Sequence, residues 1–160
     1  MERKNKILKH DLFIEYYSRI EYHERERKFC HHDMVHFLDV ARLAMILNLK
    51  EQLGVDEEFI YAAALLHDIG RFRQYEDGTP HEKASAELAW EILSECGFDR
   101  KEASVIIEAI SRHRDPNSAG EKNLNGLLYR ADKMSRSCFC CKAEPECDWK
   151  AEKKNHILVY

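Results

Sequence analysis

The 160-residue chain carries a formal net charge of -4, with 34% charged and 44% hydrophobic residues. Basic and acidic residues are mixed along it, which excludes a broad basic face for nucleic acid or an anionic membrane surface. Its beginning lacks the apolar stretch of a signal peptide, and no apolar run is long enough to span a bilayer. We therefore expect a cytoplasmic protein whose 6 cysteines are thiols or metal ligands rather than disulfides.

Helical periodicity runs through almost the whole chain. The first predicted helix covers residues 9–28, and the second covers about 33–53, where apolar side chains recur at three- and four-residue spacing. The third follows Asp56 as its N-cap and ends at His67, just before Gly70. The pattern up to this point is that of a helical bundle.

The second half of the chain continues this pattern. After a predicted loop at 73–80, a helix runs to Gly97, with Thr79 as its N-cap and Pro80 in its first turn. A further helix is predicted from Asp99 to about His113. A loop at 115–123 then leads to a last helix at about 123–136. Only the closing HILVY alternates like a strand. We predict one all-α domain, with a core at about 31–136 and a Cys-rich tail at 137–160.

Six imidazole and carboxylate groups lie on these apolar segments or at their ends, where an unpaired polar group is costly. They are His36, His67, Asp68, His81, His113 and Asp132. One histidine on an apolar face is more often a hydrogen-bonded core residue than a ligand, but six such groups on five helices are harder to explain in that way. A divalent cation would satisfy them together, since imidazole and carboxylate suit zinc, iron, manganese and similar ions. His67 and Asp68 are about 100° apart around a helix, so we expect an ion beyond the helix end.

Five segments resemble, in the right order, the motifs of the HD-domain superfamily of metal-dependent phosphohydrolases. They are HFLDVA at 36–41, LLHDIGR at 65–71, HEKASAELA at 81–89, AISRHR at 109–114 and RADKMSR at 130–136. The resemblance covers about residues 31–136 and implies a helical bundle. It also implies a metal bound by His36, His67, Asp68 and Asp132.

Two further histidines, His81 and His113, match family members that have a two-metal centre. These members include HD-GYP phosphodiesterases and the bacterial HD-type diadenosine tetraphosphate hydrolases. The chain lacks a GYP element after its HD doublet, which argues against a cyclic-dinucleotide phosphodiesterase. The short loop before His81 leaves a second reading open, in which this histidine caps a helix or binds substrate phosphate.

The expected chemistry is that of the ion. A metal lowers the pKa of bound water from 15.7 towards ~7 and screens the phosphate charge, and a second ion can hold both the attacking and the leaving oxygen. Asp68 is suited to bridge two ions or to orient the water. Arg71 is the first candidate for binding phosphate oxygens, because a guanidinium binds phosphate in a bidentate way. Further candidates, each more often a solvated surface residue, are Arg112, Arg114, Lys133 and Arg136.

His32 lies four residues before His36, on the same helix face. It is a ligand, a partner of a ligand or a partly exposed histidine, and we favour the exposed position. The tail segment CFCCKAEPEC at 138–147 contains a second candidate metal site. Cys138 and Cys141 form C-x2-C, Cys147 follows, and Cys30 is the candidate fourth ligand of a structural zinc or iron–sulfur site. The alternative is that these thiols pack as small hydrophobic groups.

The leading hypothesis is a metal-dependent phosphohydrolase acting on a nucleotide or similar small phosphate ester. It would use one or two divalent ions, drawn from Fe, Mn, Zn, Co, Ni and Mg. The alternative is a non-catalytic, redox-responsive module that binds a metal or a nucleotide and signals through the cysteine tail. A purely structural helical protein ranks last, because it leaves six polar groups on apolar segments without a role. The sequence specifies neither the substrate nor the oligomeric state.

Overall fold

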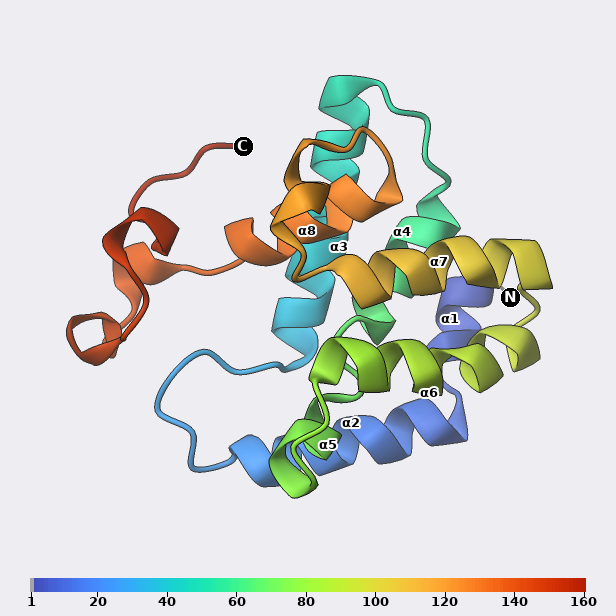
Figure 1. Cartoon of the computed structure of the whole chain (residues 1–160), viewed down its shortest axis with the longest axis horizontal. Coiled ribbons are helices and arrows are strands. Elements are labelled where there is room, and N and C mark those ends of the chain that lie inside the picture. The colour runs from blue at the N-terminus through green and yellow to red at the C-terminus, as the bar shows by residue number, and fades with distance from the viewer. Residues whose placement is uncertain (1) are drawn as a thin grey trace.

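A computed structural model describes residues 2–160, and every regular element in that range is helical (Figure 1). The α-helices are α1 (Arg3–Ile7), α2 (Asp11–Glu24), α3 (Met34–Glu51), α4 (Glu57–Leu66), α5 (Arg71–Glu76), α6 (His81–Glu95), α7 (Arg100–Arg112) and α8 (Leu124–Met134). Four 3-10 turns complete the set: η1 (Pro116–Gly120), η2 (Cys138–Cys140), η3 (Glu144–Glu146) and η4 (Ala151–Lys153). The predicted all-α class is confirmed, and the closing HILVY forms no strand within the described residues.

The helix predicted at 9–28 corresponds to α2, which is shorter and ends at Glu24, and the preceding helix α1 was not predicted. Helix α2 begins after His10, whose Nδ1 accepts a hydrogen bond from the Leu12 backbone N–H at 3.2 Å and so caps the helix. Helical periodicity alone did not reveal this side-chain cap.

The segment predicted as a loop at 73–80 is partly helical. Helix α5 begins directly after Gly70 and occupies the first part of that segment. Pro80, rather than Thr79, is the N-cap residue of α6, so the predicted Thr79 cap is wrong. The Thr79 backbone N–H instead donates to Asp77 Oδ1 at 2.8 Å. The predicted caps at Asp56 and Asp99 are confirmed, since each accepts hydrogen bonds from the first turn of its helix.

Helix α4 lies at the centre of the bundle and contacts α1, α3, α6, α7 and α8. Its residues 62–64 are all alanine and fully buried, which lets the surrounding helices approach closely. Leu65 and Leu66 continue this buried stretch. The C-terminal end of α4 therefore delivers His67 and Asp68 into the interior, where they are 0% and 2% exposed.

Gly70 lets α6 pack directly on the turn after the His-Asp doublet. A Cβ atom at this position would lie 2.4 Å from the Ser85 backbone N and 2.6 Å from the Ala84 carbonyl carbon. The Gly70 N–H also donates to Ser85 Oγ at 2.9 Å. This close approach fixes the start of α6, and with it His81, relative to Asp68.

The C-terminal segment 137–160 lies to one side of the bundle, beyond the end of α8 (Figure 1). It consists of the three short turns η2, η3 and η4 and their connections. Among the described helices, none is both long enough and apolar enough to cross a membrane.

Candidate metal centre

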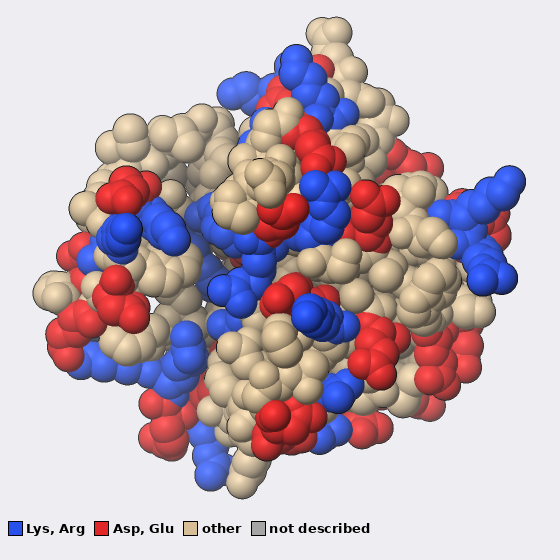
Figure 2. All heavy atoms as spheres, in the orientation of Figure 1, with Lys and Arg blue, Asp and Glu red and all other residues tan. Residues whose placement is uncertain are grey.

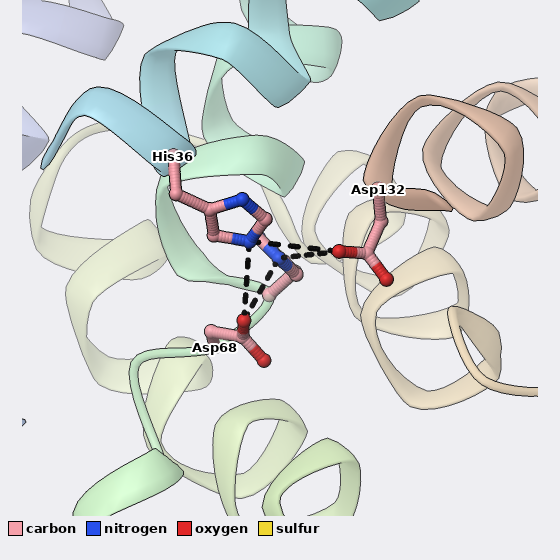
Figure 3. A group of neighbouring side chains, drawn as sticks. His36, Asp68 and Asp132 are labelled. Atoms are coloured by element: carbon pink, nitrogen blue, oxygen red, sulfur yellow. Dashed lines mark ion pairs between the residues drawn. The ribbon is translucent and has the colours of Figure 1, made fainter. Parts of the chain in front are cut away.

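Three elements bring the first group of ligand-type side chains together. His36 comes from the first turn of α3, Asp68 from the residues just after α4, and Asp132 from α8 (Figure 3). His67, directly before Asp68, is the C-cap residue of α4. Asp68 Oδ2 lies 3.1 Å from His67 Nε2 and 3.4 Å from His36 Nε2. Asp132 Oδ1 lies 3.5 Å from His36 Nε2 and 3.8 Å from His67 Nε2. All four ligand atoms lie within 4.8 Å of one another.

A second group adjoins the first and shares Asp68 with it. Asp68 Oδ1 lies 3.2 Å from His81 Nε2 and 3.6 Å from His113 Nε2. The two histidine Nε2 atoms are 3.2 Å apart. Each oxygen of Asp68 thus faces a different set of histidines, which is the arrangement expected of a carboxylate that bridges two metal positions.

The histidine side chains are held so that Nε2 faces the centre. His67 Nδ1 donates to the Ala64 carbonyl and His113 Nδ1 donates to the Ile110 carbonyl, both at 2.7 Å. His36 Nδ1 lies 3.2 Å from Ser135 Oγ, whose hydroxyl donates to the Asp132 carbonyl at 2.7 Å. A protonated Nδ1 leaves Nε2 with its lone pair, as a metal ligand requires.

His81 has two competing neighbours at Nδ1. Gln74 Oε1 lies 2.6 Å away and Arg71 Nη1 lies 2.7 Å away. A guanidinium only donates and an amide oxygen only accepts, so Nδ1 can hydrogen-bond with one of them at a time. The bond to Gln74 is the one that frees Nε2 for a ligand role, and Gln74 comes from α5, the helix that the sequence did not predict.

The burial and charge of these groups fit divalent cations. Within the described chain, the buried atoms His67 Nε2 and Asp68 Oδ1 have no hydrogen-bond partner, and both face the centre. Burial lowers the pKa of His36 to about 4 and that of His81 to about 2, so both rings are neutral. Burial also opposes a charge on His67, but Asp68 and Asp132 outweigh it and raise its pKa to about 10. The two buried carboxylates therefore hold a proton on His67, a position that a cation would take over.

A cavity of about 190 Å³ opens beside both groups. Arg71, Arg114, Lys133 and Arg136 line it together with Asp68, His81 and His113. Figure 2 shows lysine and arginine atoms gathered around the hollow between the tail and the bundle, whereas both charges are mixed over the rest of this face. Four of the five candidates for binding phosphate thus line the cavity. Arg112 does not line it, and its Nη2 is 2.5 Å from Glu121 Oε1 on the outer side of α7.

His32 occupies a different position from the partly exposed one that we favoured. It is only 4% exposed, and its Nε2 lies 3.9 Å from Asp68 Oδ2. Its Nδ1 lies 2.5 Å from Glu24 Oε1, and its backbone N–H donates to Glu24 Oε2 at 2.7 Å. Tyr75 also donates to Glu24 Oε1, at 2.6 Å. His32 is therefore held by a buried carboxylate with its second nitrogen directed towards the metal centre.

Sequence reasoning missed Glu24 and Tyr75. Glu24 falls in the charged stretch HERERK at 23–28, which looks like a solvated helix end. Burial raises the pKa of Glu24, but the hydrogen bonds from His32 and Tyr75 outweigh it and lower the pKa to about 2. Glu24 and His32 do not lie on one helix, because the chain leaves α2 between them. Helical spacing therefore could not predict their contact.

The fold and site define an all-helical protein with adjoining histidine–carboxylate clusters of metal-ligand type. The chain belongs to the HD domain family, which matches residues 34–137. An uncharacterized protein of Clostridium beijerinckii is 48% identical over the full length of both chains. Ribonuclease Y of Enterococcus faecalis is 38% identical over 100 residues, which are 62% of this chain and 17% of that protein.

The fold is also similar to that of a solved structure. A predicted HD superfamily hydrolase from an uncultured Thermotogales bacterium superimposes with a TM-score of 0.67 at 25% sequence identity. The match covers 94% of this chain and 80% of that one. Together with the buried ligand groups, these similarities support a metal-dependent hydrolase.

Proposed function

We propose that this protein is a metal-dependent phosphohydrolase that acts on a small phosphate ester, with a nucleotide as the favoured substrate. The observation that carries the proposal is the pair of ligand groups sharing Asp68, next to a cavity lined by basic side chains. Adjoining cations and basic side chains suit a substrate whose reacting group is an anionic phosphate. All six cysteines are free thiols, which agrees with a reducing cytoplasm as the place of action.

The size and charge of the site favour a small substrate over a polynucleotide. The cavity of about 190 Å³ accommodates a phosphate group and its immediate neighbours. The chain carries a net charge of -4, and this balance disfavours binding to a nucleic-acid backbone, which needs many basic contacts. The similarity to the ribonuclease Y proteins covers 14% and 17% of their length, so we carry over from them only the phosphoester class.

The two ligand groups would hold the ions. An ion bound by His36, His67, Asp68 and Asp132, with a second bound by Asp68, His81 and His113, would supply a Lewis acid and lower the pKa of a water molecule. The protein's own part is to direct the histidine Nε2 atoms towards the ions, through the Nδ1 hydrogen bonds to Ala64, Ile110 and Ser135. At His67 the ion would replace the proton that the two carboxylates hold. It also keeps both carboxylates ionised, since the pKa values of Asp68 and Asp132 lie well below their usual range.

Arg71 is the residue that we assign to the phosphate oxygens. It lines the cavity, and its buried Nε has no hydrogen-bond partner in the described chain. Arg71 Nη1 contacts the His81 ring. Because a guanidinium is positively charged, we expect it to exchange this contact for one with an anionic phosphate oxygen of the substrate. Lys133 has an existing partner, because its Nζ lies 2.6 Å from Asp132 Oδ2. We therefore assign Lys133 to holding Asp132 and Arg71 to binding substrate.

His32 is assigned a positioning role on the reacting oxygens. Its Nδ1 is engaged by Glu24, so the free Nε2 can hydrogen-bond to a water molecule or substrate oxygen in the cavity that it lines. Tyr75 keeps Glu24 in place from α5. The arrangement holds the His32 ring in one orientation and gives the cavity an oriented polar group.

Turnover by anaerobically purified protein tests the proposal. The substrates are nucleoside phosphates, dinucleoside polyphosphates and a chromogenic phosphodiester, each with Mn²⁺, Fe²⁺, Co²⁺ or Ni²⁺. We expect metal-dependent hydrolysis of at least one class. Asp68→Asn should reduce it by more than the roughly 10- to 100-fold typical of residues that only support a ligand. Asp39→Asn changes a partly exposed carboxylate on α3 that pairs with Arg42, and it should leave hydrolysis unchanged.

Arg71→Ala separates binding from metal loading. We expect a raised KM with unchanged metal content, and partial recovery with Arg71→Lys, which restores the charge but not the bidentate geometry. If metal-loaded protein hydrolyses none of these substrates but binds nucleotide, the non-catalytic alternative replaces the phosphohydrolase. A loss of metal in Arg71→Ala would remove its assignment to substrate.

A further inference from the structure

The cysteines divide into two sets by position. Cys96 is buried in the core at the end of α6, and Cys140 is exposed, with its Sγ 3.5 Å from the Ser137 carbonyl. The other four are partly buried, and all four line one cavity of about 380 Å³, which the exposed Cys140 also borders. They are Cys30, Cys138, Cys141 and Cys147. Cys30 comes from the loop between α2 and α3, whereas the other three come from the tail, more than 100 residues later.

The tail has few other means of attachment to the bundle. In the described residues 137–160, Ala143 is the only buried side chain. Asn155 Nδ2 donates to the carbonyls of Lys133 and Arg136, at 2.7 and 2.9 Å, and Lys28 forms an exposed ion pair with Glu146. Exposed ion pairs contribute little, and ordering 24 residues carries a large entropic cost. A segment with so small an apolar core usually relies on a covalent or metal crosslink.

The surroundings of the four thiols suit an anionic metal–thiolate complex. Burial raises the pKa of Cys30, and the nearby Cys138, Cys141 and Cys147 raise it further against the opposing effect of Arg136, so this thiol keeps its proton until an ion replaces it. Lys28, Arg136 and Lys154 also line the cavity. Cys147 and Cys138 in turn contribute to a raised pKa of Lys154, after its larger contact with Glu144. A doubly positive ion with four thiolates carries a net charge of about -2, which these cations would offset.

We propose that Cys30, Cys138, Cys141 and Cys147 bind a single structural zinc ion that fastens the tail to the α2–α3 loop. Binding releases four thiol protons to solvent and involves no change in oxidation state. Among the described cysteines, no three sulfurs lie within 4.8 Å of one another. Tetrahedral zinc, with Zn–S bonds of about 2.3 Å, would draw them to roughly 3.8 Å. Both segments lie outside the α-helices, so they can contract around the ion without disturbing the core.

This zinc would also shape the wall of the catalytic cavity. Arg136 and Trp149 line both the cysteine cavity and the cavity beside the metal centre. Arg136 Nη1 donates to the His31 carbonyl at 3.1 Å, next to His32 and one residue beyond Cys30. Fixing the loop to the tail therefore fixes the side of the site that carries His32 and Arg136. The role is structural, and it stands whether or not the His/Asp centre hydrolyses phosphate.

Elemental analysis of full-length protein from zinc-supplemented cells tests the proposal. Cys147→Ser and Cys30→Ser should each lose one zinc per chain relative to wild type, whereas the matched control Cys140→Ser should keep it. Asp68→Asn should also keep this zinc, which separates it from ions at the His/Asp centre. Cobalt titration of Asp68→Asn should give an intense sulfur-to-cobalt charge-transfer band in the near ultraviolet, and the band should be absent when Cys147→Ser is added.

Chemical labelling of the cysteines in the wild-type protein tests the proposal even if a cysteine variant fails to fold. With zinc bound, iodoacetamide should label Cys140 rapidly and spare the four proposed ligands, and a chelator should expose all four together. Equal labelling with and without chelator, absence of the cobalt band, or equal zinc loss in Cys140→Ser overturns the proposal. Acid-labile sulfide with iron in stoichiometric amounts would also overturn it, in favour of an iron–sulfur cluster.

Discussion

His81 Nε2 and His113 Nε2 face each other at 3.2 Å, although they come from different helices. His113 Nδ1 donates to the Ile110 carbonyl, so its Nε2 carries a lone pair. With His81 Nδ1 bound to Gln74, the second lone pair points at the first. Two facing lone pairs in a buried site repel each other unless a cation lies between or beside them, and Asp68 Oδ1 provides the matching anionic ligand.

Metal stoichiometry should therefore depend on His81. We expect wild type to bind two divalent ions at the His/Asp centre and His81→Ala to bind one, because the group containing His36 and Asp132 remains intact. Anaerobic dialysis followed by elemental analysis, with Cys147→Ser as background to remove tail zinc, measures the difference. His156→Ala changes an exposed histidine in the tail and is the control. Two ions in His81→Ala would show that the second ion does not need His81, and one ion in wild type would reduce His81 and His113 to a hydrogen-bonded pair.

A variant of Ser135 tests whether metal binding depends on the orientation of the metal ligands as well as on their identity. Its hydroxyl lies between His36 Nδ1 and the Asp132 carbonyl, so it couples two ligands of the first group. Ser135→Ala should lower metal affinity or turnover by roughly 10- to 100-fold, the range typical for partners of metal ligands. Ser111→Ala removes a hydroxyl that bonds within α7 on the exposed surface and should have no effect. Similar metal titrations for both variants would contradict this role.

The ligand-type residues could be predicted because each carries a local anomaly. His36, His67 and Asp132 are polar groups on otherwise apolar helix faces, and such positions can be read from spacing alone. Their convergence was inferred from the need for a common cation, and the resemblance to HD-domain proteins supplied the same set. The all-α class followed from the same periodicity.

The supporting residues could not be predicted, because their roles depend on contacts between distant elements. Gln74 lies in α5, although the sequence RQYEDGTP reads as a loop, and this helix packs against both α2 and α6. In the sequence, Glu24 is part of a run of charged residues typical of a solvated helix end. In the structure, the α2–α3 loop brings His32 back into contact with it. The sequence around Arg112 and Arg114 makes both equally good candidates for binding phosphate, yet only Arg114 lines the cavity.

Gly70 should be intolerant of even one methyl group. The added Cβ of Gly70→Ala would meet the backbone of Ala84 and Ser85 at 2.6 and 2.4 Å, so α6 must shift. We expect destabilisation of roughly 1–3 kcal/mol, typical of overpacking, measured by urea unfolding. Because α6 carries His81, the variant should also lose affinity at the second metal position. Gly120→Ala meets nothing within 4 Å and should be near neutral.

The buried Glu24 predicts a distinct pH dependence of stability. Its pKa is about 2 in the folded protein against an ordinary value of 4.5, because His32 and Tyr75 donate to the carboxylate. A lowered pKa contributes stability above the unfolded value and loses it as pH falls through the folded value, so the contribution is complete above about pH 5. A shift of this size corresponds to roughly 3 kcal/mol as an upper figure.

Glu24→Gln should therefore be less stable than wild type at pH 6, and the difference should shrink as the pH falls from 4.5 towards 2. Urea unfolding at a series of pH values, followed by circular dichroism, measures this difference directly. Glu26→Gln, an exposed neighbour beyond the end of α2, should show no such trend. A difference between Glu24→Gln and wild type that stays constant from pH 6 to pH 2 would mean that the carboxylate charge does not hold His32, and that Glu24 acts there only through its shape.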